Sequence, residues 1–173
     1  VPDDAEAIIE YLRALADEPD NTIGFDASSE ITFTVEQERE TIQRNLDSDN
    51  SGFFIALNPQ GEIVSVGNVS GSKRNSYRHA AALGISVLEG WRGQGIGTAM
   101  MGHMLAWAQA TGILKRIELE VFAHNVRAIQ LYERLGFVIE GRKMKSYLKY
   151  GQYVDVVIMA LLGGTGRLWG PLA

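Results

Sequence analysis

The chain has 173 residues and a formal net charge of −5, with 46% hydrophobic and 21% charged residues. This balance is typical of one globular domain, which we place at residues 1–162, ahead of a flexible tail at residues 163–173. The absence of cysteine excludes disulfides, thiolate metal sites and cysteine nucleophiles. The sequence has neither the apolar core of a secretory signal peptide nor a run of about 18 apolar residues. We therefore expect a cytoplasmic protein without a membrane partner.

Two helices are predicted in the first third of the chain. Residues 3–16 carry apolar side chains at helical spacing, and a polar loop follows at residues 18–30. Thr34 stands three residues before Gln37, which is the pattern of a capping box and predicts a second helix over residues 34–46.

The rest of the chain alternates strands and helices. In chain order we expect strands at 52–57, 63–71 and 81–87, a helix within 89–110, a strand at 116–122, a helix at 126–136, and strands at 137–148 and 153–162. Gly84 is interpreted as a β-bulge and Gly136 as the residue that closes the last helix. This order predicts an α+β fold with a mixed sheet and helices on its faces.

Residues 89–110, EGWRGQGIGTAMMGHMLAWAQA, place four glycines directly before an apolar helix pattern. Glycine is a poor helix former, so these glycines need another explanation. A helix N-terminus offers unpaired N–H groups and the positive end of the helix dipole, and glycine lets an anion approach the backbone because no Cβ stands in the way. The glycines therefore predict a phosphate cradle, since a plain strand-to-helix turn accounts for only one or two of them.

Three types of phosphate-binding loop compete for this stretch. The Walker loop requires a lysine after its last glycine, and none follows here. The dinucleotide fingerprint G-x-G-x-x-G fails because the last glycine comes one residue early. The third pattern, [QR]-x-x-G-x-[GA], is matched by Arg92, Gly95 and Gly97.

Residues 92–97, RGQGIG, resemble the acetyl-CoA pyrophosphate loop of the GNAT superfamily of N-acetyltransferases. Residues 119–141 resemble the second half of the same fold, with Asn125 after a strand, then Ala128, Tyr132 and an LGF turn. Two ordered motifs separated by one strand are more specific than either alone. The resemblance covers residues 80–162, whereas the preceding residues match only in element order. Within the superfamily, the sequence resembles the branch of ribosomal-protein alanine and polyamine acetyltransferases.

The resemblance implies a mixed, mostly antiparallel central sheet with splayed central parallel strands and helices on both faces. It also implies acetyl-CoA as co-substrate without a metal, and a homodimer, because dimers are common in the family. The residues expected to bind the cofactor are Val87, Leu88, Arg92, Gly93, Gln94, Gly95, Ile96, Gly97, Thr98, Asn125, Ala128 and Tyr132. Basic side chains that could accompany the phosphates are Lys73, Arg74, Arg127 and Arg134.

Acetyl transfer to an amine requires a neutral nitrogen, and an alkyl ammonium has a pKa near ~10.4, so a general base is useful. Glu118 and Glu120 share one face of the predicted strand at 116–122. By resemblance, Glu120 occupies the position of the catalytic glutamate and Tyr132 that of the general acid near the sulfur. A solvent-facing role for Glu120, with Glu118 or water as the base, and a packing role for Tyr132 are the alternatives. Asn125 is also expected to cap the following helix.

Other functional classes find little support. His79, His103 and His124 have no metal-ligand spacing, and no lysine- and arginine-rich segment with interleaved aromatics indicates nucleic-acid binding. We therefore interpret the chain as an N-acetyltransferase that moves acetyl from acetyl-CoA to a small-molecule, polyamine or peptide amine by direct attack. A non-catalytic acyl-CoA-binding sensor of the same fold is the alternative.

Charge is unevenly distributed along the chain. Residues 1–50 hold 14 acidic and 3 basic side chains, whereas residues 51–173 hold 7 acidic and 13 basic ones. Negative walls concentrate a cationic substrate, so we expect a cationic acceptor steered by the acidic first third. Ordinary acidic helix faces are the alternative. The acids in and around the loop are Asp17, Glu18, Asp20, Asp26 and Glu30.

Overall fold

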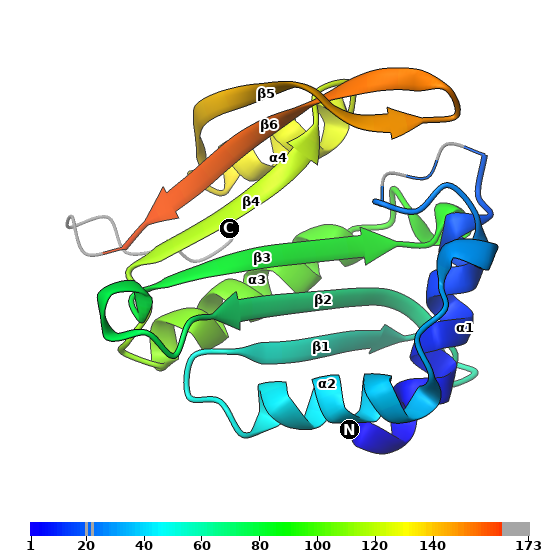
Figure 1. The fold of residues 1–173 in the computed structure, drawn as a ribbon. Coiled ribbons are helices and arrows are strands. Elements are labelled where there is room, and N and C mark those ends of the chain that lie inside the picture. Colours follow the sequence, from blue (N-terminus) through cyan, green and yellow to red (C-terminus); the bar gives the residue numbers. More distant parts are fainter. Residues whose placement is uncertain (20, 22, 164–173) are drawn as a thin grey trace.

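The computed structural model describes residues 1–19, 21 and 23–163, so the predicted tail lies outside the described residues from residue 164 onward. One six-stranded sheet, in the order β1-β2-β3-β4-β6-β5, runs through the molecule (Figure 1). Its strands are β1 (Gly52–Leu57), β2 (Ile63–Gly71), β3 (Ala80–Val87), β4 (Arg116–Phe122), β5 (Val138–Lys149) and β6 (Gln152–Leu162). Every neighbouring pair is antiparallel except β3 and β4, which are parallel.

The two parallel strands separate along their length. Ala80, Ala81 and Ala82 of β3 pair with residues 116–118 of β4. Beyond these three pairs, β3 and β4 do not pair with each other. Beyond the point of separation each strand keeps its antiparallel neighbour, β2 for β3 and β6 for β4, so the sheet opens between β3 and β4 while both outer halves stay paired. The mixed sheet with splayed parallel strands is therefore confirmed.

Helices cover both faces of the sheet (Figure 1). The helices are α1 (Ala5–Ala16), α2 (Val35–Leu46), α3 (Ile96–Ala110) and α4 (Val126–Arg134). Successive side chains of a strand point to opposite faces, and β1 shows both partners: Phe53 and Ile55 pack in the α1–α2 clusters, whereas Phe54 packs against the cluster that includes α3 and α4. This arrangement confirms the expected α+β fold.

Several local predictions are confirmed. Thr34 accepts a hydrogen bond from the amide of Gln37 at 3.2 Å, while the Gln37 side chain accepts one from the Thr34 amide at 2.8 Å, which completes the capping box of α2. Gly136 follows α4 with a φ of 92°, the left-handed conformation that favours glycine after a helix.

The interpretation of Gly84 as a bulge is wrong. The pairing of β2 with β3 is continuous from Ser65 opposite Val87 to Gly71 opposite Ala81, without a shift in register. A Cβ on Gly84 would lie 2.7 Å from Oδ1 of Asn68, so the glycine makes room for that side chain across the strand pair. The glycine in this strand reflects a close approach of a neighbouring side chain and not an extra residue.

A buried lysine ties the α1–α2 loop to the β5–β6 hairpin. Lys149, at the end of β5, is only 6% exposed. Its ammonium donates to Asn21 Oδ1 at 2.8 Å and to the carbonyl oxygens of Ile23 at 3.0 Å and Phe25 at 2.6 Å, and pairs with Asp26 Oδ1 at 3.0 Å. These bonds hold a segment without regular secondary structure against the hairpin, beside the opening in the sheet.

Replacing Lys149 with methionine should lower the free energy of unfolding by about 2 to 3 kcal/mol, because buried and partly buried oxygen atoms lose their donor while the apolar stem is kept. Urea unfolding measures the change. Lys115→Met is a suitable control, since Lys115 is exposed and its side chain makes no bond within the described chain; it should change stability by less than about 0.5 kcal/mol. Equal stabilities of the two variants would contradict the role given to Lys149.

Candidate active site

The glycine-rich loop leads from β3 into α3. Gly93 and Gly95 have φ values of 83° and 85°, and Gly95 is the N-cap of the helix. The backbone N–H groups of residues 93–98 donate no hydrogen bond to another described residue, because a helix begins without partners for its first amides. A Cβ on Gly95 would meet no atom within 4 Å, so the space in front of these amides is open. The loop therefore presents free donors and the positive end of a helix to a small anion.

Arg92 fixes the start of this loop to two other elements. Its Nε donates to the carbonyl oxygen of Val87, the last residue of β3, at 2.8 Å, and its terminal nitrogen forms an ion pair with Glu18. The other oxygen of the Glu18 carboxylate accepts the amide of Glu89 at 2.7 Å. The Glu18 carboxylate thus joins the segment after α1 to Glu89 and Arg92, the two ends of the turn that precedes Gly93.

A cavity, which we call the loop cleft, lies between the end of β3, the glycine loop and α4. Its lining residues include Ile85, Ser86, Val87, Arg92, Gly93, Gly95, Gly97, Thr98, Asn125, Arg127, Ala128, Leu131, Tyr132 and Arg134. Asn125 accepts the amide of Ala128 at 3.2 Å, so the expected cap of α4 is confirmed. The cleft brings most of the predicted cofactor-binding residues together with two arginines. The predicted residues that do not line it are Leu88, Gln94, Ile96, Lys73 and Arg74.

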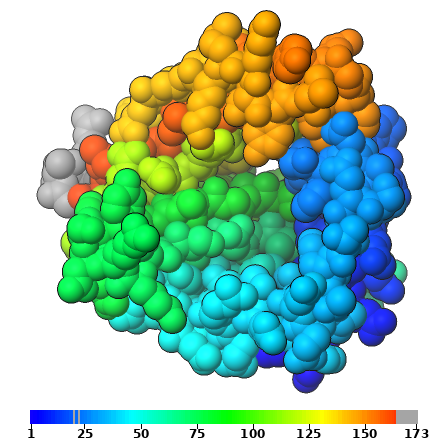
Figure 2. Space-filling view, in the orientation of Figure 1, coloured from blue at the N-terminus to red at the C-terminus, as the bar shows by residue number. Residues whose placement is uncertain are grey.

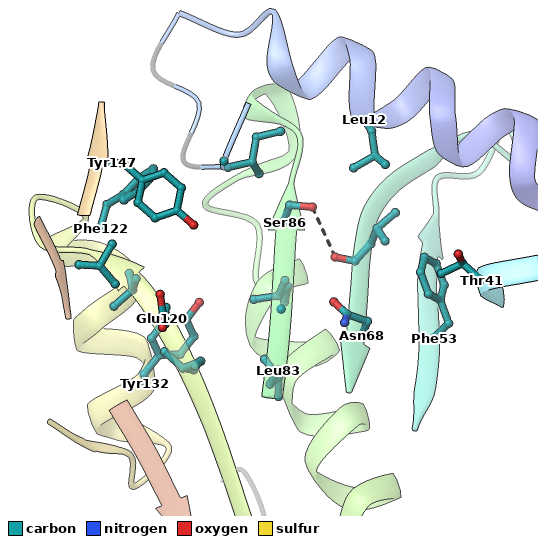
Figure 3. A pocket seen from close by; sticks show the side chains of 18 of the residues that line it. Leu12, Thr41, Phe53, Asn68, Leu83, Ser86, Glu120, Phe122, Tyr132 and Tyr147 are labelled. Carbon is teal, nitrogen blue, oxygen red and sulfur yellow. Dashed lines mark hydrogen bonds between the residues drawn. The ribbon is translucent and has the colours of Figure 1, made fainter. Parts of the chain in front are cut away.

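A second cavity, which we call the central pocket, lies where β3 and β4 diverge. Figure 2 shows this face of the molecule hollowed between the orange β5–β6 hairpin, the blue N-terminal segment and the green strands. The pocket is lined by Leu12, Ile23, Gly24, Glu38, Thr41, Phe53, Val66, Asn68, Leu83, Gly84, Ile85, Ser86, Leu119, Glu120, Val121, Phe122, Tyr132, Tyr147 and Val156. In Figure 3, Thr41, Phe53 and Asn68 lie on one side of Ser86, and Glu120, Phe122, Tyr132 and Tyr147 lie on the other.

Tyr132 lies where the two cavities meet. It lines both of them, as do Ile85 and Ser86. Its residue exposure is 7%, its ring packs 5.8 Å from that of Phe137, and its hydroxyl makes no hydrogen bond within the described chain. Burial raises the pKa of Tyr132 to about 12, so the hydroxyl keeps its proton at neutral pH. It is a neutral acid at the junction of two open spaces.

The two predicted glutamates of β4 differ in their surroundings. Glu120 lines the central pocket and its carboxylate forms an ion pair with Lys143 of β5; that bond raises the pKa of Lys143. Glu118 does not line the central pocket, and its carboxylate accepts two bonds from Arg116, at 3.1 and 3.2 Å. The side chain of Glu120 is 45% exposed. Of the two, Glu120 is therefore the one that a ligand in the pocket can reach.

Glu38, on α2, was not singled out by sequence reasoning. It is one of three alternating glutamates on a polar helix, which conceals it, yet it is buried at 8% exposure and lines the central pocket. Burial raises the pKa of its carboxyl. The available signal was helical spacing, because Glu38 lies three residues before Thr41 and four before the buried Ile42, on the inward face of the helix.

Four of the five acids expected to steer a cation are engaged in hydrogen bonds or ion pairs within the protein. Asp17 accepts the amide of Ser28 at 2.8 Å, which lowers the pKa of that carboxyl, and Glu30 accepts the amide of Asp26 at 3.2 Å. Glu18 and Asp26 pair with Arg92 and Lys149, as described above, and Asp20 lies outside the described residues. Steering by this segment stays a prediction.

The described residues were also considered as possible metal ligands and as possible membrane-spanning helices. Within residues 1–19, 21 and 23–163, no group of three or more His, Asp or Glu side chains is arranged to hold a metal ion. In the same part of the chain, no helix is long and apolar enough to cross a membrane.

Comparison with known proteins decides the family. The model of the acetyltransferase (GNAT) family matches residues 11–137. The chain belongs to the GNAT acetyltransferase family. The resemblance to the GNAT superfamily is thereby confirmed.

Individual GNAT relatives share part of their length with this chain. It is 36% identical over 100 residues to the L-amino acid N-acetyltransferase AaaT of Escherichia coli (strain K12), covering 58% of this chain and 62% of the relative. It is 35% identical over 123 residues to the [Ribosomal protein uS5]-alanine N-acetyltransferase of the same organism, covering 70% and 61%. The chain thus spans less than two thirds of either relative.

A solved structure matches over nearly the full length. The acetyltransferase of the GNAT family from Streptococcus pneumoniae superposes with a TM-score of 0.87 at 28% identity, covering 94% of this chain and 95% of that one. The fold, including the divergent parallel strands, is therefore that of a GNAT protein.

Proposed function

We propose that this chain is an acetyl-CoA-dependent N-acetyltransferase that moves the acetyl group to an amine by direct attack. The observation that carries the proposal is the meeting of two cavities at Tyr132, one beside a phosphate-type loop and one beside the carboxylate of Glu120. Membership of the GNAT family and relatives named as N-acetyltransferases support the same reaction class.

The loop cleft fits acetyl-CoA, which supplies an acetyl thioester when bound. Free amides at residues 93–98 would take the pyrophosphate, and a Cβ at Gly93 would approach the Arg127 guanidinium to 3.2 Å, so the loop and that cation already share one space. Arg134 lines the same cleft and adds a second positive charge for the phosphates. Val87 would face the pantetheine arm from the end of β3.

The acceptor amine would enter the central pocket. Glu120 would take a proton from the amine, directly or through water, so that the nitrogen carries a free electron pair. As the nitrogen forms its bond to the carbonyl carbon, the bond from that carbon to sulfur breaks. Tyr132 would give its proton to the departing sulfur and regain one, directly or through water, from the second proton that the nitrogen loses as the amide forms; its raised pKa keeps the hydroxyl protonated at neutral pH.

Turnover tests the proposal. The protein is incubated with acetyl-CoA and a panel of polyamines, alkylamines, amino acids, aminoglycosides and N-terminal peptides, while free thiol and acetylated product are measured. Thiol release that depends on an amine supports the proposal. Tight binding of acetyl-CoA without amine-dependent thiol release would instead indicate the non-catalytic sensor.

Glu120→Gln should lower kcat/KM about tenfold and flatten the acid limb of its pH profile, because the variant has no carboxylate to protonate. The effect is moderate because Glu120 is partly exposed and water can accept the proton in its place. Glu118→Gln is the matched comparison, because Glu118 lies two residues earlier on the same face of β4 and does not line the central pocket. A flattened limb in the Glu118 variant alone would move the role of base to Glu118.

The names of the relatives indicate the chemical class of the acceptor. The relatives are named for L-amino acids and for a ribosomal-protein alanine, so an amine nitrogen is the shared feature. A cytoplasmic location and a homodimer stay predictions from the sequence and the family resemblance.

A further inference from the structure

Glu38 is a buried residue whose carboxylate has no partner among the described residues. It is 8% exposed, and its side chain makes no hydrogen bond and no ion pair within the described residues. No fully buried side-chain oxygen in that part of the chain lacks a partner, so the carboxylate oxygens of Glu38 keep some exposed surface. The central pocket is the cavity that Glu38 lines, so that surface faces the pocket.

A buried carboxylate in this position destabilises the folded protein unless a ligand pairs with it. Burying a charged carboxylate without a partner is costly, and the raised pKa of Glu38 expresses that cost. The neighbouring glutamates of α2 show the ordinary alternative: Glu36 and Glu40 are exposed, and Glu36 pairs with Arg39. A ligand that brings a positive charge to Glu38 would offset the cost.

The charge of the central pocket has one sign. Glu38 and Glu120 are its charged lining residues, and no lysine or arginine lines it. Glu120 has Lys143 as a partner outside the pocket lining, whereas Glu38 has no partner in the part of the chain that the structure describes. An acceptor with a carboxylate directed toward α2 would therefore be repelled, and one with a cation there would be attracted.

The two carboxylates stand on different elements with apolar walls between them. Glu38 comes from α2, beside Thr41 and Phe53, and Glu120 comes from β4, beside Tyr132. Figure 3 shows Thr41 and Phe53 across β3 from Glu120 and Tyr132. Apolar side chains of the sheet, including Val66, Leu83 and Ile85, line the space that separates the two groups.

We infer that Glu38 binds a second, protonated nitrogen of the acceptor, so that the preferred substrates are small amines with a cationic nitrogen at each end of an apolar spacer. This inference rests on the proposed function, since it assumes that the acetylated nitrogen lies beside Tyr132. One nitrogen then occupies the Glu120 end of the pocket as a neutral amine, while the other stays charged at Glu38 and fixes the depth at which the spacer lies.

A matched series of amines tests the inference. Diaminoalkanes from 1,3-diaminopropane to 1,8-diaminooctane are compared with n-alkylamines of the same lengths, and agmatine tests a guanidinium at the far end. We expect kcat/KM to favour the best diamine over its monoamine by about tenfold or more, mainly through KM. In Glu38→Gln this ratio should fall toward one.

Glu40→Gln is the control variant. It removes the same charge two residues away from an exposed side chain that makes no bond within the described chain, so a ratio unchanged from the parent excludes a general effect of net charge. Glu38→Met, which keeps the shape and removes every polar atom, is measured alongside. Both Glu38 variants should fold, with a Tm at neutral pH equal to or above that of the parent.

The outcomes separate the two proposals. A parent enzyme without preference for diamines, a preference that survives in Glu38→Gln, or a best substrate with a free carboxylate would overturn the inference while leaving the acetyltransferase assignment intact. Calorimetric binding of the best diamine that is lost in Glu38→Gln, without acetylation of any amine, would support the Glu38 site and overturn the proposed function.

Discussion

Tyr132→Phe should lower kcat about a hundredfold while changing the affinity for acetyl-CoA by less than about twofold. The substitution removes one hydroxyl and keeps the ring, which packs against Phe137 in the main core cluster. Because that hydroxyl makes no hydrogen bond within the described chain, its loss leaves no group of the protein unpaired. The energetic effect therefore falls on the transition state, where the departing sulfur needs a proton.

The pH profile of the parent enzyme adds a second readout. Burial raises the pKa of Tyr132 to about 12, and an acid is lost only as the pH rises through its pKa. Titration of Tyr132 should thus cause no loss of kcat between neutral pH and pH values near 10. Tyr77→Phe, at an exposed tyrosine outside both cavities, serves as the control. Unchanged kcat in Tyr132→Phe would mean that the thiolate departs without help from this residue, and a parallel loss of acetyl-CoA affinity would indicate a binding role.

The elements of the fold could be predicted from the sequence because their signals are local. The capping box at Thr34, the alternation in residues 116–122 and the glycine after α4 each depend on residues close together in the chain. The glycine loop was found in the same way, since four glycines before an apolar helix have few structural explanations. Gly84 shows the limit, because its neighbour Asn68 lies on another strand.

The rest of the site depends on contacts between distant segments. Arg92 was expected to accompany the cofactor, yet its partner Glu18 lies 74 residues earlier in the chain. Lys149, near the end of the predicted strand at 137–148, is buried against a loop more than 120 residues away. Periodicity and spacing report on residues close together in the chain, so they predict neither pairing.

The shape of β5 was also beyond the sequence signals. The register of β5 against β6 shifts between Lys143 and Tyr147, where Lys145 has a φ of 52°. Asp155 of β6 accepts the amide of Lys145 at 2.7 Å and a bond from Arg142 at 2.9 Å, which stabilises the irregular segment. As a result, Tyr147 lines the central pocket. A regular strand was the reasonable expectation, because the alternation of the sequence gives no warning of the shift.

Gly95→Glu should weaken acetyl-CoA binding about a hundredfold. The substitution places a side chain and a negative charge in the open space before the free amides of residues 93–98. Hydrogen bonds to a charged group contribute about 1.5 to 3 kcal/mol each, so the loss of one or two of them accounts for the expected change in Kd. Isothermal titration with acetyl-CoA measures it.

Strain must be separated from the loss of the cradle. Gly95 has a φ of 85°, which costs a non-glycine residue roughly 1–2 kcal/mol. Gly61, in the turn between β1 and β2, has the same φ and equally open surroundings, so Gly61→Glu carries the same strain and charge away from the loop cleft. We expect the two variants to lose similar stability, and only Gly95→Glu to lose acetyl-CoA affinity.

S-acetylpantetheine locates the effect within the ligand, because it keeps the thioester and lacks the pyrophosphate. If the amides of residues 93–98 hold the pyrophosphate, Gly95→Glu should weaken acetyl-CoA strongly and S-acetylpantetheine by less than about twofold. The same variant should then turn over both thioesters at similar kcat/KM, because the groups that act on the acetyl carbon lie at the other end of the loop cleft, at Tyr132. Equal weakening of both ligands would place the damage in the shape of the cleft, and unchanged affinity for acetyl-CoA would remove the phosphate cradle from this loop.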